Sequence, residues 1–442
     1  MRLSFIPRAI LGVYQVTKYW ANLLHIYQPP TQDREVLARI NETCYLPLFR
    51  MLDTLPNIKT TFNISGVLLD LLDQWNYQET IQLIRKLLFK GSIEIVGTAK
   101  FHPLLPIIPE KEVIRQIQLN RETNLKYFGK DSSSGFFSPE LAISDKVLKI
   151  IKDMGYNWAI VSGVASEPGN WITTKIQKTP YGLTIFYRDD FISNKIAFNN
   201  ISAMDFVNNI LLGIKEEEEN ENRKKENGNI ESKTETEFLI TALDGETFGH
   251  HIAYYEKEFL GQVYHLLQTH TTEVKTIFLS ELIDLFPEGD MTLPKASSWS
   301  TTGKDLENGV YFPLWSHPSN PVHKVQRKMV KALDKLIGLC DSCNEKNQID
   351  QNYYISARYF YDRSLYSCSS WWASMRPSWN PILIFKGANM MMLAALNAKL
   401  ALTYAKVEEE SEEIYDQITN YFSQLLSELS KQSINLINAK IS

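Results

Sequence analysis

The stretch FLITALDGETFGH, residues 238–250, combines the two features that decide the fold of this chain. It begins with a mostly apolar run of strand length, and Asp244 follows that run directly, on a glycine turn. The stretch GFFSPE, residues 135–140, repeats the arrangement with an apolar strand, a proline and then Glu140. Because the carboxyl ends of the strands meet on one rim of a parallel barrel, the two carboxylates predict a shared site there.

Outward from these stretches, short apolar strands alternate with amphipathic helices over the first 290 residues. The strands are predicted at residues 20–26, 59–64, 92–96, 135–138, 158–161, 238–243 and 276–279. A further β-rich patch covers residues 183–198. The first strand carries His25 near its end, so we expect a third polar side chain on the rim. Seven strand–helix steps in order predict an α/β fold, either a parallel barrel or an open doubly wound sheet.

The chain divides into two predicted domains. Residues 1–290 form the α/β domain, in which the charged segment 215–237 has almost no apolar side chains and predicts a solvated insertion. Residues 291–442 change to long helices, with apolar residues three and four positions apart at 323–340, 388–407 and 412–439. We therefore expect a helical C-terminal domain that contributes to the active-site cleft.

Composition narrows the classes of partner and cofactor. The net charge of -5 without a basic patch argues against nucleic acid. The four Cys make no disulfide framework, and the pair Cys340 and Cys343 lacks a second CxxC or a nearby His. We therefore expect neither a metal nor another cofactor. The N-terminus shows no signal peptide and no apolar run long enough to span a membrane, so we expect a cytoplasmic protein.

Two carboxyl groups at one rim fit the cleavage of a glycosidic bond. In the retaining reaction one carboxylate attacks the anomeric carbon, while the other protonates the leaving oxygen and later deprotonates water. On the residues alone, Glu140 and Asp244 carry this chemistry about as readily as they cap the helices that follow them.

Five segments resemble the ordered motifs of glycoside hydrolase family 57. The segments are His25–Pro29, Ile93–Gly97 with His102–Pro106, Gly135–Glu140, Asp244–His250, and in the C-terminal part Ser297–Ser300 with Ser367–Ser374. The resemblance covers nearly the whole chain except the charged segment. It implies a (β/α)7 barrel followed by helices, retention of anomeric configuration and an α-glucan substrate.

The resemblance also implies a role for each matched residue. Glu140 matches the family nucleophile and Asp244 the general acid/base. The residues expected to bind sugar are His25, Gln28, Glu94, His102, Arg188, Glu246, His250, Trp299 and Trp371. Arg188 either lowers the pKa of a carboxylate near the nucleophile or makes a structural salt bridge. Two positions depart from the family pattern, because this chain has Phe136-Phe137 and His251 where many members carry Trp.

Two other classes of protein compete with this interpretation. A metal-dependent carbohydrate enzyme, such as a polysaccharide deacetylase or a zinc α-mannosidase, commonly needs a His-x-Asp or Asp-Asp ligand cluster. Tyr27 stands two positions after His25, and Asp189-Asp190 has no His-x-x-x-His nearby, which disfavours that class. A non-catalytic sugar-binding protein has no need for both Glu140 and Asp244.

Within the enzyme hypothesis, hydrolysis, 4-α-glucanotransfer and branching share one chemistry and differ in the acceptor. We favour α-amylase-like hydrolysis of α-1,4-glucans, then transfer, then branching. The mechanism requires ionised Glu140 and protonated Asp244, so we expect their surroundings to shift the two pKa values in opposite directions.

Overall fold

The computed structural model describes residues 18–131, 134–167, 172–213, 236–269, 271, 273–403 and 405–441. Most of the expected charged insertion, up to residue 235, lies outside the described residues. The last of its residues, Glu237, is the first residue of strand β8 rather than part of a solvated segment.

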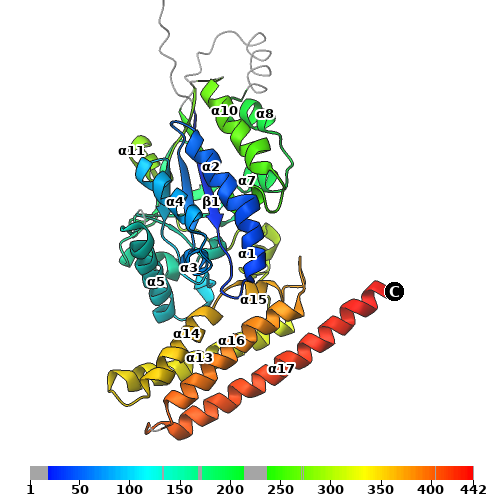
Figure 1. Ribbon diagram of the computed structural model, residues 1–442. Coiled ribbons are helices and arrows are strands. Elements are labelled where there is room, and N and C mark those ends of the chain that lie inside the picture. The colour runs from blue at the N-terminus through cyan, green and yellow to red at the C-terminus, as the bar shows by residue number, and fades with distance from the viewer. Residues whose placement is uncertain are drawn as a thin grey trace, which may run out of the picture.

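In the described part of the chain, ten strands form two sheets of five strands each. Figure 1 shows how the sheets and the surrounding helices are arranged. They are β1 (Lys18–Ile26), β2 (Thr60–Ile64), β3 (Ile93–Val96), β4 (Gly135–Phe137), β5 (Trp158–Ser162), β6 (Ile176–Lys178), β7 (Thr184–Arg188), β8 (Glu237–Asp244), β9 (Val274–Thr276) and β10 (Glu288–Met291). One sheet has the order β3-β2-β1-β8, with β9 also on β1, and the other has the order β10-β6-β7-β5-β4.

Backbone hydrogen bonds join the two sheets at two seams. Between β3 and β4, Gly97 N–H donates to Gly135 O over 2.8 Å, and Phe137 N–H donates to Gly97 O over 2.9 Å. Between β7 and β8, Asp189 N–H donates to Ile240 O over 2.9 Å. The strands β1, β2, β3, β4, β5, β7 and β8 therefore follow one another round a ring. This confirms a (β/α)7 barrel and excludes the open sheet.

One strand of the predicted barrel was wrong. The predicted seventh strand at 276–279 is only partly a strand, because β9 ends at Thr276 and pairs with the first three residues of β1, and Leu279 begins a helix. The seventh place in the ring belongs to β7, inside the predicted β-rich patch. This strand was not predicted separately, because the second half of the patch is a helix. Asp189 caps that helix by accepting a hydrogen bond from the N–H of Ile192.

Helices cover the outside of the barrel. They are α1 (Arg34–Ile40), α2 (Leu46–Thr54), α3 (Gly66–Gln74), α4 (Gln78–Lys90), α5 (Glu110–Phe128), α6 (Asp145–Asp153), α7 (Asp190–Ala197), α8 (Ala203–Asp205), α10 (Gln262–Thr269) and α11 (Leu279–Leu285). The interior is packed with inward-facing side chains, which include Leu23, Val96, Phe137, Ile160 and Ala242. The barrel is therefore a filled core whose site lies at an end.

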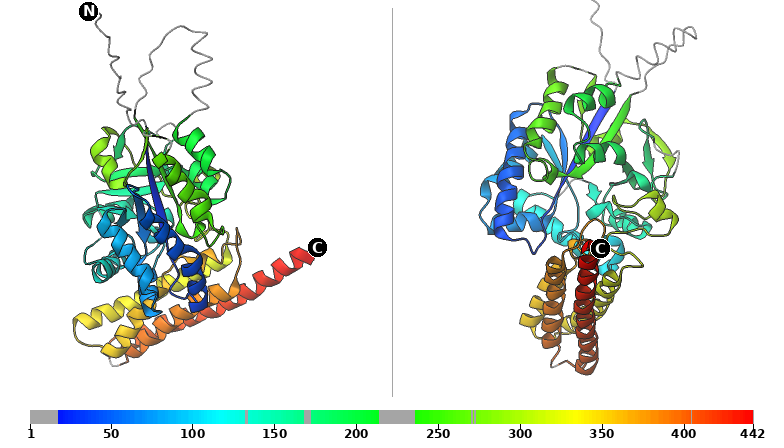
Figure 2. Two further views of the ribbon diagram at one scale, coloured as in Figure 1. Left: turned by 45° about the horizontal axis from the view of Figure 1, so that its top comes forward. Right: turned by 90° about the vertical axis from the view of Figure 1, so that its right-hand side faces the viewer.

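The described elements after β10 are all helical. They are α12 (Gly303–Glu307), α13 (Pro321–Glu345), α14 (Gln351–Ser364), α15 (Cys368–Trp371), α16 (Pro381–Ala401) and α17 (Glu408–Ile441). Figures 1 and 2 show β1 pointing toward these helices, with α15 near its carboxyl end. The carboxyl-end rim of the barrel thus faces the helical part.

Two features of the helical part differ from expectation. The helix α14 was not predicted, because two of its four buried residues, Asp362 and Ser364, are polar and break the apolar pattern. Among the described residues, α16 is long and apolar enough to cross a membrane, with a mean hydropathy of 1.3, although no such run was expected. It packs against α13, α14 and α17, as the central helix of a bundle does.

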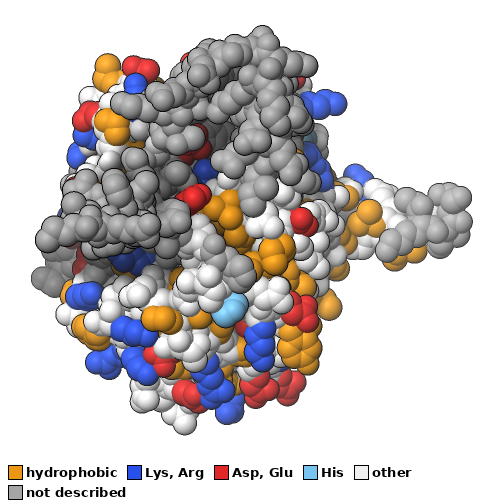
Figure 3. Space-filling view, turned by 90° about the horizontal axis from the view of Figure 1, so that it is seen from above, with side chains coloured by type: hydrophobic (Ala, Val, Ile, Leu, Met, Phe, Trp, Pro, Cys, Tyr) orange, Lys and Arg blue, Asp and Glu red, His pale blue; other side chains and the backbone are white. Residues whose placement is uncertain are grey.

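The surface seen from above shows Lys and Arg side chains interspersed with Asp and Glu over its described part (Figure 3). At one side of this view α17 projects past the barrel, and its exposed residues include Ile434 and Ile437.

Candidate active site

Glu140 stands in a strained turn at the end of β4. Its φ of 61° lies in the left-handed region, which residues other than glycine seldom adopt. The indole N–H of Trp299 donates to Oε2 of Glu140 over 2.9 Å, and the backbone N–H of Trp299 donates to the Glu140 carbonyl over 3.1 Å. The turn and Trp299 together hold the carboxyl group in one orientation.

Two histidines and a serine lie beside the other oxygen of Glu140. Oγ of Ser367 is 3.2 Å from Oε1 of Glu140 and 2.9 Å from Nδ1 of His102. Nε2 of His102 is 3.1 Å from Nε2 of His25, whose Nδ1 is 2.6 Å from Oδ1 of Asn63. These groups come from three strand ends of the barrel and from the start of α15.

Asp244 ends β8 in register with His25 on β1, so the two residues share the catalytic rim. Glu246 follows in the next turn and accepts hydrogen bonds from Tyr45 OH over 2.5 Å, from Tyr27 N–H over 3.1 Å and from Gln28 Nε2 over 3.3 Å. Gln28 and Glu246 thus bond to each other at the rim, in a buried polar cluster.

Arg188 combines the two roles that its sequence context left open. Its guanidinium donates to Asp190 Oδ1 over 2.6 Å and to Asn194 Oδ1 over 2.9 Å, which is a structural ion pair. Burial raises the pKa of Asp244, the predicted acid/base, and the positive charge of Arg188 opposes that rise.

The two catalytic carboxyls do not diverge in pKa as expected. Burial, followed by the charge of Asp244, raises the pKa of Glu140 to about 8. Burial also raises the pKa of Asp244 to about 6, against the opposing charge of Arg188. The expectation of opposite shifts was wrong, because both groups lose water and the charge of Asp244 adds to the rise at Glu140.

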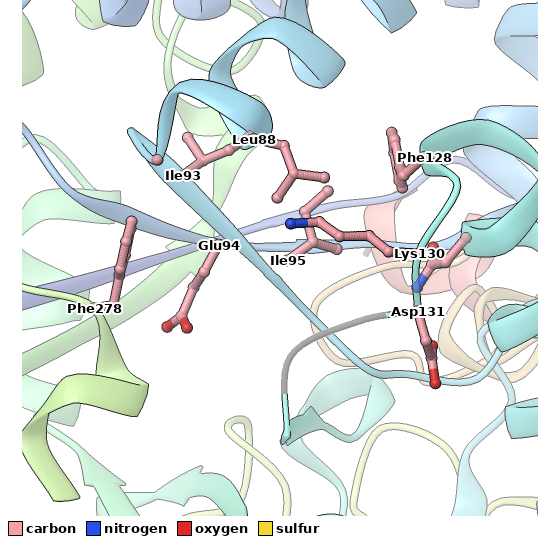
Figure 4. A pocket seen from close by; sticks show the side chains of 10 residues that line it. Leu88, Ile93, Glu94, Ile95, Phe128, Lys130, Asp131 and Phe278 are labelled. Atoms are coloured by element: carbon pink, nitrogen blue, oxygen red, sulfur yellow. The ribbon is translucent and has the colours of Figure 1, made fainter. Parts of the chain in front are cut away.

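Two predicted sugar-binding residues lie away from this group. Glu94 is the second residue of β3, so it lies toward the amino end of that strand. Its carboxylate accepts hydrogen bonds from the side chains of Thr61 and Ser280. It lines a different pocket, together with Lys130 and Phe278 (Figure 4). Its assignment to the sugar site is corrected, because the register with Thr61 places it two residues below the rim.

The prediction that His250 binds sugar is also corrected. The cavity of about 430 Å³ beside Asp244 is lined by His251 and not by His250. Since neighbouring residues of a turn face different ways, His250 instead lies near Arg39, whose charge contributes to lowering its pKa.

The two tryptophans lie together on the helical side of the site. Trp299 and Trp371 pack against one apolar cluster that contains Leu104, Leu314 and Trp315. Trp299 also lines the cavity beside Asp244. The structure therefore brings both predicted aromatic residues near the rim.

Several residues of the site were missed from the sequence. They are Tyr27, Tyr45, Asn63, Phe198, Ser367 and Cys368. His251, named from the sequence as a departure from the family pattern, lines the cavity beside Asp244. Asn63 had a usable signal, because it is a buried polar residue within the strand TTFNI and in register with His25. Ser367 lies in the segment Ser367–Ser374 that resembles a family motif, but its contact with Glu140 depends on the fold.

Within the described residues, no group of three or more His, Cys, Asp or Glu side chains is arranged to hold a metal ion. The printed hydrogen bonds of the Glu140 carboxyl group are those from Trp299 and Ser367.

The sequence profile described as Glycosyl hydrolase family 57 matches residues 13–295, which is more than half of the chain. The chain belongs to this family. The matched region contains Glu140 and Asp244, while Ser367 and Trp371 lie beyond it.

Curated relatives of this family 57 chain are moderately similar to it. An α-amylase of Pyrococcus horikoshii is 23% identical over 328 residues, which are 71% of this chain and 46% of the relative. A 4-α-glucanotransferase of Thermococcus litoralis is 24% identical over 316 residues, which are 65% of this chain and 43% of the relative. The chain spans about half the length of these relatives.

Solved structures show the same fold. A family 57-type branching enzyme of Pyrococcus horikoshii aligns with a TM-score of 0.67 at 14% identity, over 92% of this chain and 94% of the other. The 4-α-glucanotransferase of Thermococcus litoralis aligns with a TM-score of 0.61 at 17% identity, over 86% of this chain and 60% of the other.

Proposed function

We propose that this family 57 chain is a retaining α-glycosidase that hydrolyses α-1,4-glucans. The observation that carries the proposal is the placement of Glu140 and Asp244 on one rim, close enough that the charge of Asp244 raises the pKa of Glu140. The names of the relatives, α-amylase and 4-α-glucanotransferase, support an α-glucan as the substrate.

The reaction has two steps. In the first, a Glu140 oxygen bonds to the anomeric carbon, the glycosidic bond breaks, and Asp244 gives its proton to the leaving oxygen. In the second, Asp244 takes a proton from water, the water oxygen bonds to the anomeric carbon, and Glu140 leaves as a carboxylate. Trp299 and Ser367 donate toward the oxygens of Glu140, so they stabilise the carboxylate at the start and at the end.

The first step needs the proton on Asp244, although Glu140 has the higher pKa. The site fits a shared proton, because two buried carboxyls in mutual repulsion hold one negative charge more readily than two. The positive charge that develops on the sugar ring favours an ionised Glu140. Substrate binding therefore moves the proton toward Asp244.

A specific observation keeps 4-α-glucanotransfer as the second candidate. The cavity beside Asp244 is lined by Phe198, which is 71% exposed, and by His251 and Trp299. An exposed aromatic face next to the acid/base suits a second sugar, which can leave or can return as the acceptor. Product analysis on maltooligosaccharides separates the two, since products longer than the input indicate transfer.

The assignment of the pair is tested by chemical rescue with azide. Asp244→Ala, assayed on an aryl α-glucoside whose leaving group needs no proton, should regain turnover with azide and release the α-glucosyl azide. Glu140→Ala with an α-glucosyl fluoride should give the β-glucosyl azide, because azide then attacks directly. For both variants, kcat on amylose should fall by about 10⁴-fold or more, given the usual effect of removing such a catalytic group. Identical anomers from the two variants would refute the assignment.

Two controls separate the competing classes. Activity that survives EDTA would rule out a metal-dependent enzyme, and activity lost with EDTA and restored by a divalent metal would favour one. If Glu140→Gln binds glucans as the wild type does while wild type shows no turnover, the protein is a binding module instead.

A further inference from the structure

A continuous chain of hydrogen-bonding groups runs from β2 to the nucleophile. It starts at Oδ1 of Asn63, passes through both ring nitrogens of His25 and both of His102, and reaches Oγ of Ser367. The last contact joins Ser367 to Oε1 of Glu140. The separations are 2.6, 3.1, 2.9 and 3.2 Å, so each link has the length of a hydrogen bond.

The protons in this chain cannot be placed independently. A neutral imidazole has one donor and one acceptor nitrogen, and a serine hydroxyl has one proton. With Oδ1 of Asn63 as an acceptor, His25 carries its proton on Nδ1 and accepts at Nε2 from His102. His102 then accepts the only proton of Ser367 at Nδ1, so Oε1 of Glu140 has to donate to Ser367. This first arrangement fits a protonated Glu140.

An ionised Glu140 reverses every link. Ser367 then donates to Glu140, His102 carries its proton on Nδ1, and His25 carries its proton on Nε2. Nδ1 of His25 needs a donor, and a half-turn of the Asn63 amide supplies Nδ2. In the described part of the structure Nδ2 of Asn63 is buried without a hydrogen-bond partner, so no other bond holds it back. The change removes one proton from the site, and both imidazoles stay neutral.

We propose that Asn63, His25, His102 and Ser367 are positioning residues that couple the ionisation of Glu140 to the tautomers of both histidines. The proposal rests on the proposed function, because Glu140 is the nucleophile in it. It assigns to Asn63 and Ser367 a part in setting when the nucleophile is ready, besides orienting its carboxyl group.

Ser367 is held firmly enough for this role, although it comes from the helical part. Its backbone N–H donates to the carbonyl of His102 over 2.9 Å, and Tyr366 pairs with Pro103 in an antiparallel bridge. The segment around Ser367 is thus fastened to the barrel loop that carries His102.

The surroundings keep the histidines in the neutral form that the chain requires. Burial lowers the pKa of His25 to about 4 and that of His102 well below its ordinary value. An imidazolium has no acceptor nitrogen and would break the chain.

The other titratable groups that face Glu140 come from separate elements. They are Asp244 at the end of β8, Tyr27 after β1 and Cys368 in α15. Burial raises the pKa of Tyr27 and of Cys368, so both stay uncharged near neutral pH. Asp244 is therefore the charged neighbour that acts on Glu140.

Nitrogen-15 NMR of histidine-labelled protein reads the tautomer of each ring without substrate. We expect His25 and His102 to exchange their protonated nitrogens together as pH rises through the ionisation of Glu140. In Glu140→Gln, which has no carboxyl group at this position, both rings should keep one tautomer over the same range. Single-residue His→Gln proteins assign the signals. Rings that keep one tautomer in wild type, or that still switch in Glu140→Gln, would overturn the proposal.

Kinetics give a second readout. Ser367→Ala removes one of the two donors to Glu140, so the acidic limb of kcat/KM should move to higher pH by about one unit. Ser367→Thr keeps the hydroxyl and should keep the limb. An alanine variant with lower activity but an unmoved limb would mean that Ser367 only packs. If the wild type has no glycosidase activity but its two tautomers still switch together, only the proposed function is refuted. If the wild type is active but its tautomers do not switch, only the proposed hydrogen-bond coupling is refuted.

Discussion

Glu140 combines a left-handed backbone with a mostly buried carboxyl group, and both features cost stability. The φ of 61° is unfavourable for a side chain with a Cβ, and burial penalises the charged form of the carboxyl. Functional sites store such unfavourable terms because the rest of the fold holds them in place. The catalytic residue is therefore a point where the free energy of folding depends on pH.

The sign of this dependence follows from the direction of the shift. The Glu140 carboxyl ionises near 4.5 in an unfolded chain and at about 8 in the folded protein. Between these values the folded state binds more protons, so stability falls as pH rises and the loss is complete above about 8. Glu140→Gln has no charge to bury, so its Tm should exceed that of wild type by about 1–4 °C at pH 9 and by little at pH 4.

Thermal unfolding at the two pH values checks this prediction. Glu258→Gln, an exposed substitution of the same chemical kind, serves as the control and should change Tm little at either pH. A Glu140→Gln protein with the same advantage at both pH values would show that the gain comes from packing and not from charge.

At the scale of elements, the turn after β8 depends on close backbone packing. Gly249 has a φ of 119°, and a Cβ at this position would lie 2.0 Å from the carbonyl oxygen of Thr43. This contact seats the turn that carries Asp244 and Glu246 against the segment that precedes α2. A glycine is therefore required here for two separate reasons.

Gly249→Ala should lower the free energy of unfolding by about 2–4 kcal/mol, because both the clash and the positive φ oppose the new side chain. It should also reduce kcat, since the turn has to shift. Gly303→Ala is the matched control, because a Cβ there meets nothing within 4 Å and its φ is not in the left-handed region. Urea unfolding measures both variants, and equal losses would contradict the argument.

At the scale of the whole molecule, partly buried ion pairs join the helical part to the barrel. Arg115 on α5 makes two hydrogen bonds to Asp362 on α14, of 2.8 and 2.7 Å. Arg358 on α14 bonds to both oxygens of Glu112 over 3.0 and 3.1 Å. The residue Ser367 follows α14 by three positions, so these pairs help to set where it meets Glu140.

Asp362→Asn should therefore affect both stability and catalysis. Breaking a mostly buried pair on one side costs about 2–3 kcal/mol, and kcat should fall because Ser367 loses its support. Glu79→Gln, which removes an exposed ion pair with Arg50, should change the free energy of unfolding by no more than about 0.5 kcal/mol. Chemical denaturation with parallel assays checks both, and an Asp362→Asn protein with wild-type kcat would show that the barrel places Ser367 alone.

Much of the fold could be predicted, because period-two and helical patterns are local. The strands β1, β4 and β8, which place His25, Glu140 and Asp244, follow from such patterns, as do the helices α13, α16 and α17. The strand β7 and the helix α14 could not be predicted, since a helix adjoins the first within one apolar patch and the second buries polar residues. Local hydrophobic patterns do not separate a strand from a helix within one apolar stretch, and they do not reveal a helix that buries polar residues.

The sequence by itself determined the α/β class and the two carboxylates that end apolar strands, since chain connectivity places such residues at one rim. Only the tertiary structure decided which neighbours reach them. It excluded Glu94 and His250 from the rim, and it brought in Asn63 and Ser367, which lie 304 positions apart. Hydrogen bonds between distant segments depend on register and helix docking, and no local pattern in the chain encodes these.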